Sequence, residues 1–290
     1  MIDLHVHTKY SDGTDDVPEL LARAEAAGLE CISITDHNDC RAYEVLCKLN
    51  VKDYYSGRII PGCEFNASIQ GILIEILGYK VDMNVLSAKL PDYYSPSSQQ
   101  RSLEFQRILE VCRKCGVTMD ENAINFNPVV HTSEECIHKE IVRHPENKKF
   151  FVSEKAWQDE NAFYRLCLSN PKDVFYIDYS DLYPSAAQVV NLIKEAGGLV
   201  FIPHIYQYGE NSEMIFQTLM RDYPIDGIEC YYKMYSDEQT RFLINFCREN
   251  HLYMSGGTDY HGEARPGVKL GLGRGNLDIP FSLVADWVDK

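Results

Sequence analysis

Asp16-Val17-Pro18-Glu19 opens a stretch that ends in Glu30-Cys31-Ile32-Ser33-Ile34-Thr35 and decides the fold. Asp16 can cap a helix, Pro18 suits its first turn, and Glu19 stands three residues after the cap, where a capping box places it. Gly28 closes this helix. The apolar run that follows has the composition of a buried strand, so the stretch predicts one helix and one strand in succession.

The same unit recurs twice later in the chain. Ser185 begins a second helix that ends at Gly197-Gly198, and the strand Leu199–Ile202 follows. Ser236 begins a third helix, which the strand Leu252–Ser255 follows. Helices and strands that alternate at this spacing predict an α/β fold, built on a parallel sheet or a barrel.

The middle of the chain has a different composition and pattern. Leu90–Ser98 is a cluster of turn residues, and residues 99–175 carry helix signals and polar residues without the strand that follows each helix elsewhere. We therefore expect a first α/β part over 1–90, an inserted, mostly helical subdomain that acts as a lid over 91–175, and a second α/β part over 176–290.

Composition limits the classes of function. Lys and Arg number 28 and Asp and Glu 43, which gives a formal net charge of −15, and 45% of residues are hydrophobic. A folded chain this acidic is not expected to grip long nucleic acid through its phosphates. No apolar run reaches the roughly 18 residues of a spanning helix, and no export signal opens the chain, so we expect a cytoplasmic protein that does not enter a membrane. The ten scattered cysteines, Cys112 and Cys115 included, are expected to be reduced thiols.

Imidazole and carboxylate side chains gather at the ends of the predicted strands. His5 and His7 are two residues apart on one strand, so their side chains point to the same face and can bind a single ion. Strand ends are where α/β folds place their active sites, and mixed His and carboxylate ligands suit Zn, Mn or Fe. The other strand-end residues are Asp12, His37, Glu64, His204, Asp259 and His261. Together they predict a metal centre, whereas His131, His138, His144 and His251 lie outside this pattern and are expected to make local hydrogen bonds.

The ordered motifs resemble those of the PHP (polymerase and histidinol phosphatase) superfamily. They are His5-Val6-His7-Thr8 with Ser11-Asp12-Gly13, Thr35-Asp36-His37-Asn38, Gly62-Cys63-Glu64, Pro203-His204 and Gly257-Thr258-Asp259-Tyr260-His261-Gly262. The central insert is similar to that of the branch related to nucleoside 3′,5′-bisphosphate phosphatases. The resemblance implies a distorted (β/α)7 barrel with two or three divalent metal ions at the strand ends.

The resemblance also implies which residues hold the ions. One ion would be held by His5, His7, Glu64 and Asp259, a second by Glu64 and His204, and a third by Asp12, His37 and His261. Glu75 stands where the family commonly has a His. It can still be a ligand, which would favour Mn or Fe over Zn, or it can point away from the second ion.

The implied chemistry is attack on phosphorus by a hydroxide that bridges two ions. Glu64 and Asp259 would act in catalysis through that hydroxide, while the ions neutralise the phosphoryl oxygens. Asp36 is either a support for a ligand or a helix cap. For phosphate recognition the first candidate is Arg265, and Arg107 and Arg143 of the insert are weaker ones. Tyr231 and Tyr232 either stack on a substrate or pack at the rim of the barrel.

We therefore expect a phosphoric-ester hydrolase that acts on a small phosphorylated metabolite, a nucleotide monoester or bisphosphate. Two alternatives stay open: a 5′–3′ exonuclease acting on short RNA or DNA, and a non-catalytic metal-binding module. Histidinol phosphate is a third candidate substrate, but the insert and the Ser11-Asp12-Gly13 opening are unlike that branch of the family. No obligate protein partner is expected.

Overall fold

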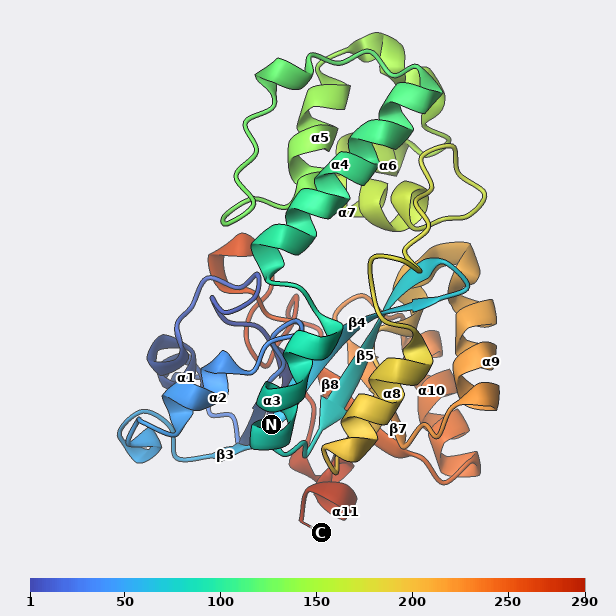
Figure 1. Ribbon diagram of the computed structural model, residues 1–290. Coiled ribbons are helices and arrows are strands. Elements are labelled where there is room, and N and C mark those ends of the chain that lie inside the picture. Colours follow the sequence, from blue (N-terminus) through green and yellow to red (C-terminus); the bar gives the residue numbers. More distant parts are fainter. Residues whose placement is uncertain (290) are drawn as a thin grey trace.

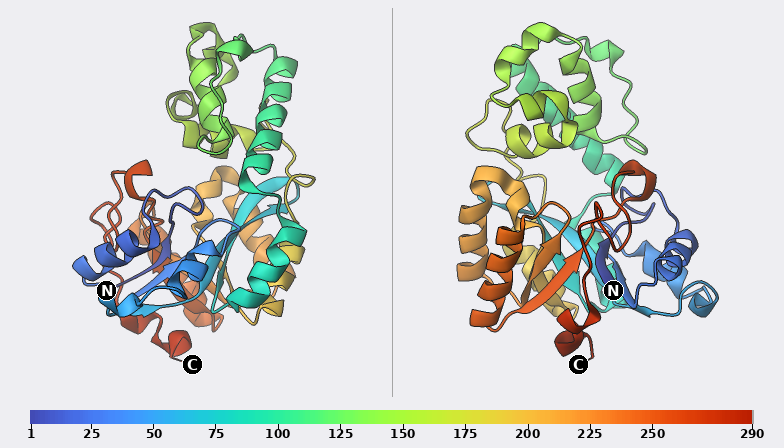
Figure 2. Two further views of the ribbon diagram at one scale, coloured as in Figure 1. Left: turned by 60° about the vertical axis from the view of Figure 1, so that its left-hand side comes forward. Right: turned by 180° about the vertical axis from the view of Figure 1, so that it is seen from behind.

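The computed structural model describes residues 1–289, so Lys290, the last residue of the third predicted segment, lies outside the described residues. The fold is mixed α/β and has two parts: strands and their covering helices below, and a group of helices above (Figure 1). The two views of Figure 2 show the same separation.

A parallel three-stranded sheet forms first. It has the order β1-β2-β3, from β1 (Ile2–Val6), β2 (Cys31–Ile34) and β3 (Arg58–Ile59), with α1 (Val17–Ala26) and α2 (Arg41–Leu46) in the connections. The predicted cap of α1 is confirmed, because Asp16 accepts from the Glu19 backbone and Glu19 accepts from the Asp16 backbone. Gly28 follows the helix at a φ of +66°, which favours glycine.

A second sheet of five strands carries the rest of the lower part. Its order is β4 (Gly62–Ile69), β5 (Ile72–Tyr79), β6 (Leu199–Ile202), β7 (Gly227–Tyr232) and β8 (Tyr253–Gly257). The helices that follow β5 or join these strands are α3 (Met83–Tyr93), α8 (Ala186–Glu195), α9 (Ser212–Asp222) and α10 (Asp237–Glu249), and α11 (Ala285–Val288) is the last helix of the described residues. Capping boxes at Ser185 and Ser236 begin α8 and α10, which confirms both predicted helix starts.

The expectation that the strands run parallel is wrong for β4 and β5. They form an antiparallel hairpin, and β5 also pairs antiparallel with β6. Gln70 and Gly71 connect the hairpin with φ values of 51° and 80°, the backbone of a two-residue turn that suits the twist of paired strands.

The two sheets do not close into a continuous barrel. Isolated bridges join them at Val6 with Tyr260 and at His37 with Glu64. Both bridges involve residues at or next to the predicted ligand positions, so the sheets meet where the candidate site lies.

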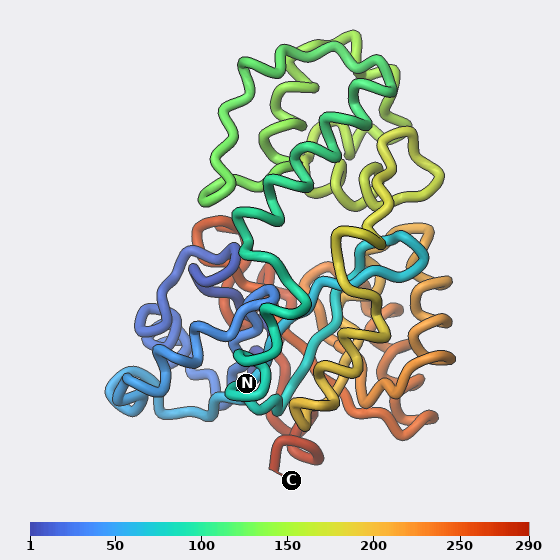
Figure 3. The backbone as a smooth tube through the Cα atoms, viewed as in Figure 1, coloured from blue at the N-terminus to red at the C-terminus, as the bar shows by residue number. Residues whose placement is uncertain are grey.

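The upper part, here called the helical insert, covers residues 97–168. It contains α4 (Ser97–Cys115), α5 (Ser133–Val142), α6 (Glu154–Gln158), α7 (Glu160–Phe163) and a π-helical turn (Tyr164–Leu168). Buried apolar residues from these helices, among them Phe105, Ile137 and Phe163, form a cluster distinct from those around the sheets. The chain enters the insert through α4 and returns to the lower part before α8 (Figure 3).

The predicted turn cluster Leu90–Ser98 begins too early, because α3 continues to Tyr93 with Pro91 in its last turn. Leu86 and Leu90 are buried on one face of α3, and this packing outweighs the proline. No helix of the described chain is long and apolar enough to cross a membrane. All ten cysteines are free, and neither Cys112 nor Cys115 belongs to a metal-ligand group within residues 1–289.

Candidate metal centre

Strand β1 brings two imidazoles to one side of the sheet. His5 lies on β1 and His7 directly follows it, and both side chains are fully buried. Their ring centroids are 5.2 Å apart, so the predicted shared face is confirmed.

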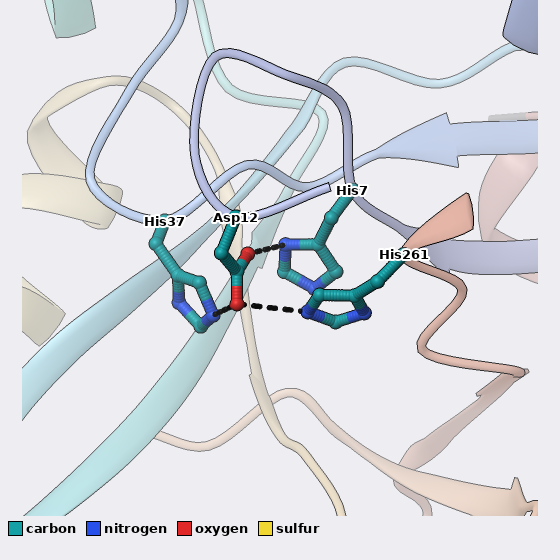
Figure 4. Close-up of side chains that lie close together, drawn as sticks. All are labelled: His7, Asp12, His37 and His261. Carbon is teal, nitrogen blue, oxygen red and sulfur yellow. Dashed lines mark hydrogen bonds and ion pairs between the residues drawn. The ribbon is translucent and has the colours of Figure 1, made fainter. Parts of the chain in front are cut away.

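The first group of potential ligands surrounds Asp12 (Figure 4). Asp12 Oδ2 lies 3.0 Å from His261 Nε2 and 3.8 Å from His37 Nε2. Asp12 Oδ1 lies 3.6 Å from His7 Nδ1. Three segments distant in sequence therefore converge on one carboxylate.

Two further groups are centred on Glu64, at the start of β4. Glu64 Oε2 lies 3.1 Å from His5 Nε2 and 3.3 Å from His7 Nε2. Glu64 Oε1 lies 2.8 Å from His204 Nε2, which is itself 3.6 Å from Glu75 Oε2. His7 joins the first group to the second and Glu64 joins the second to the third, so the three groups form one continuous cluster.

Unpaired buried atoms show that the cluster fits cations. His7 Nε2, Asp12 Oδ1 and His37 Nδ1 are buried, and none has a hydrogen-bond partner among residues 1–289. Burial opposes the charge on Glu64, but the imidazoles of His5 and His37 hold the pKa of that carboxyl well below its usual range. Unpaired buried polar atoms are costly, and nitrogen and oxygen donors in this mixture suit Zn, Mn or Fe.

Asp259, just after β8, has its two oxygens in different environments. Oδ2 accepts from Lys233 Nζ and Arg265 Nη1, each at 2.7 Å, and from the Tyr232 hydroxyl at 3.0 Å. Oδ1 lies 3.3 Å from His7 Nε2. Asp259 thus reaches the cluster through one oxygen, although it belongs to none of the three compact groups.

Sequence analysis missed two residues that support the ligands. Glu229 on β7 lies 2.9 Å from His5 Nδ1 through Oε1 and accepts from the His204 backbone through Oε2. Lys233 directly follows β7 and is 6% exposed. The available signals were an acidic residue inside an apolar strand and a lysine at a strand end, next to Tyr232.

Asp36 supports the loop that carries Asp12. It accepts hydrogen bonds from the Thr8 backbone and hydroxyl, at 2.7 and 2.6 Å, and from the Ser11 hydroxyl at 2.6 Å. The N-cap of α2 is Cys40, so the helix-cap interpretation of Asp36 is wrong.

A cavity of about 900 Å³ lies between the cluster and the helical insert. Asp12, His37, Glu75 and Arg265 line it from the lower part, and Arg165 lines it from the insert. Tyr232 also lines the cavity, whereas Tyr231 packs against the apolar core.

The structure does not bring Arg107 to this cavity. Arg107 pairs with Asp181 and lines a separate cavity of about 390 Å³, because it lies further along α4 than Gln100 and Glu104, which line the large cavity. Arg143 pairs with Glu140 and is likewise outside the large cavity. Helical periodicity alone could not decide which turn of α4 lies beside the site.

The chain resembles known proteins over nearly its whole length. It is 25% identical over 290 residues to a 5′-3′ exoribonuclease of Haemophilus influenzae, covering 98% of this chain and 97% of that protein. It is 25% identical over 281 residues to a 3′,5′-nucleoside bisphosphate phosphatase of Chromobacterium violaceum. This match covers 93% of this chain and 90% of that protein.

The fold also has a solved counterpart. The structure of an amidohydrolase from Chromobacterium violaceum matches with a TM-score of 0.64 at 20% identity, covering 93% of this chain and 89% of that one. The family model of the PHP domain matches residues 3–146, which contain His5, His7, Asp12, His37 and Glu64. This protein therefore carries a PHP domain, matched over residues 3–146.

Proposed function

We propose that this protein is a metal-dependent phosphoesterase that hydrolyses a small phosphorylated metabolite, a nucleotide monoester or bisphosphate. The observation that carries the proposal is the continuous cluster of three ligand groups beneath a cavity of about 900 Å³. A cavity of this volume has room for a nucleotide. The bisphosphate phosphatase among the relatives supports the same substrate class.

The ligand set follows from the three groups. His5, His7 and Glu64, with Asp259 Oδ1 close by, would hold one ion, and Asp12, His37 and His261 would hold another. A neutral imidazole offers one acceptor nitrogen, so His7 would serve one of these ions. Glu64, His204 and Glu75 form the third group, which gives two or three divalent ions of Mn, Zn or Fe. We also propose that the two sheets together correspond to the distorted (β/α)7 barrel that the resemblance implies, in an open form that isolated bridges join at the site.

Bound divalent ions lower the pKa of water and neutralise charge on phosphoryl oxygens. The protein side chains hold and orient the candidate ligand residues. Glu229 fixes the ring of His5, Asp36 fixes the loop before Asp12, and Lys233 holds Asp259. Arg265, 35% exposed and in the cavity lining, would donate to a phosphoryl oxygen of the substrate.

A second candidate is a 5′–3′ exonuclease acting on short RNA or DNA, since the Haemophilus influenzae relative is an exoribonuclease matched over 97% of its length. The formal charge of −15 favours the small substrate over a polynucleotide. The free cysteines support a reducing compartment, and we propose the cytoplasm.

Phosphate release by the Mn-loaded protein tests these candidates. The panel contains nucleoside monophosphates, 3′,5′-bisphosphates, cyclic phosphates, histidinol phosphate and short oligonucleotides. Turnover of one small ester supports the phosphatase, and trimming of oligonucleotides alone supports the nuclease. Inactivity on every compound by a protein that still binds metal would favour the non-catalytic module.

A further inference from the structure

An ion pair ties the helical insert to the metal-ligand cluster. Arg165, in the π-helical turn, donates from Nη2 to both carboxylate oxygens of Glu75, at 2.8 Å each. The Glu75 side chain is 5% exposed and that of Arg165 is 17% exposed. Glu75 stands where the family commonly has a His. Its carboxylate therefore already faces a cation, the guanidinium of Arg165.

Aromatic residues hold the guanidinium in this place. The Arg165 Cζ atom lies 5.0 Å from the ring centroid of Tyr164 and 5.5 Å from that of Tyr208. The Tyr208 hydroxyl also accepts from the Glu75 backbone N–H at 2.9 Å. These contacts fix both members of the pair, so little side-chain entropy remains to be lost on binding a ligand.

One end of the guanidinium is unused. Arg165 Nη1 is buried and has no hydrogen-bond partner among residues 1–289. Arg165 lines the same cavity as Asp12, His37 and Arg265. A buried donor of this kind, beside a cluster that fits cations, suits an anionic oxygen of the substrate.

We propose that Arg165 takes the place of one divalent ion in this centre. Resting on the proposed function, the inference is that Arg165 Nη2 neutralises Glu75 and Nη1 binds a phosphoryl oxygen. A divalent ion between Glu64, Glu75 and His204 would lie beside a buried positive charge, and the two cations would repel each other in a poorly screened site. The protein then binds two divalent ions, and Glu75 is not a ligand to either.

Counting bound Mn²⁺ tests the first half of this inference without any measurement of turnover. Metal-depleted protein is saturated with Mn²⁺, freed of unbound ion and analysed by elemental mass spectrometry. We expect two ions per chain in the wild type and in Glu75→Gln, and three in Arg165→Met, where Glu75 loses its cation. Arg107→Met removes an arginine from the same insert, outside the cavity, and should leave the count at two.

Two outcomes of this count overturn the inference alone: three ions in the wild type, or the loss of one ion in Glu75→Gln. Binding of no ion would overturn the proposed function as well. The double variant Glu75→Gln/Arg165→Met removes both charges, so no buried charge is left unpaired. It can be measured even where Arg165→Met alone does not fold. We expect it to bind two ions, and a count of one would contradict the proposal.

Inorganic phosphate tests the second half. Calorimetric titration of the Mn-loaded protein with phosphate should give an affinity lower by about tenfold or more in Arg165→Met and in the double variant, since each loses a charged hydrogen bond. Glu75→Gln keeps the guanidinium and should bind phosphate within a few-fold of the wild type, as should Arg107→Met. Unchanged phosphate affinity in the double variant would show that Arg165 does not bind the anion.

Discussion

Lys233 Nζ lies 2.7 Å from Asp259 Oδ2, and both side chains are buried. Lys233 also donates to the Asp259 backbone oxygen at 3.0 Å. Asp259 has a positive φ of 51°, which a residue other than glycine rarely adopts. The lysine thus holds one carboxylate oxygen and the backbone beside it, and this leaves Oδ1 directed at His7.

Replacing Lys233 by Met should weaken the metal centre. Without Nζ, Asp259 loses a fixed orientation and a compensating charge, and supports of this kind typically account for 10- to 100-fold in metal affinity or activity. The concentration of Mn²⁺ that gives half-maximal phosphate release is expected to rise by about that factor. Lys269→Met, at an exposed position, is the control and should not move it. An unchanged Mn²⁺ dependence in Lys233→Met would show that Lys233 does not position Asp259.

Asp259→Asn should leave a folded protein whose turnover is lower by about 100-fold or more. The amide is nearly the same size, but it has no negative charge to face His7 or to pair with Lys233 and Arg265. Circular dichroism checks folding, and phosphate release under saturating Mn²⁺ checks turnover. Near-normal metal-dependent turnover would contradict the assignment of Asp259. Loss of metal and folding, with no turnover in the wild type, would favour the non-catalytic module.

Removing metal should lower the stability of the protein. The buried carboxylates and imidazoles of the cluster would then lack the cations that their unpaired atoms fit. A ligand present at 100 times its Kd stabilises the state that binds it by about 2.7 kcal/mol, so chelation should lower the Tm by several degrees. Thermal unfolding with EDTA and with excess Mn²⁺ measures the difference. Equal Tm values under the two conditions would speak against a folded metal site.

Stability should also depend on Glu104, which lines the cavity on α4. Burial raises the pKa of Glu104 to about 7, against a hydrogen bond from Tyr183 that lowers it, and nearby Glu134 adds to the rise. The folded state therefore favours the protonated form. The stability that protonated Glu104 gives the folded state is fully present at a pH below the ordinary pKa of a glutamate. It is lost as the pH rises through about 7.

Urea unfolding at pH 5 and pH 8, in EDTA, checks this prediction. The wild type should lose more free energy of unfolding between the two values than Glu104→Gln does. Glu110→Gln changes an exposed residue of the same helix and should behave like the wild type. If Glu104→Gln showed the same pH dependence as the wild type, Glu104 would not titrate in this range.

Local signals in the sequence identified most members of the candidate ligand groups. The capping boxes at Asp16, Ser185 and Ser236 set where three helices begin, because caps depend on neighbours in the chain. Alternation along β1 placed His5 and His7 on one face. The strand-end motifs named the members of the ligand groups, since each motif lies within a few residues of a strand that can be recognised by itself.

Pairings between distant segments required the tertiary structure. The β4–β5 hairpin replaced the expected parallel arrangement, because strand direction depends on which edges meet and not on local composition. Arg165 and Glu75 are 90 residues apart, and no pattern along the chain connects them. The packing of the insert likewise sets which turn of α4 reaches the large cavity, and Arg107 lies beyond that turn.

The sequence by itself thus determined which imidazole and carboxylate residues make up most of the candidate ligand groups, because residue type and strand-end position are local properties. The tertiary structure alone decided which buried charges pair with each other: Lys233 and Arg265 with Asp259, and Arg165 with Glu75. The physical reason is that electrostatic partners are chosen by distance and burial in space, and folding sets both.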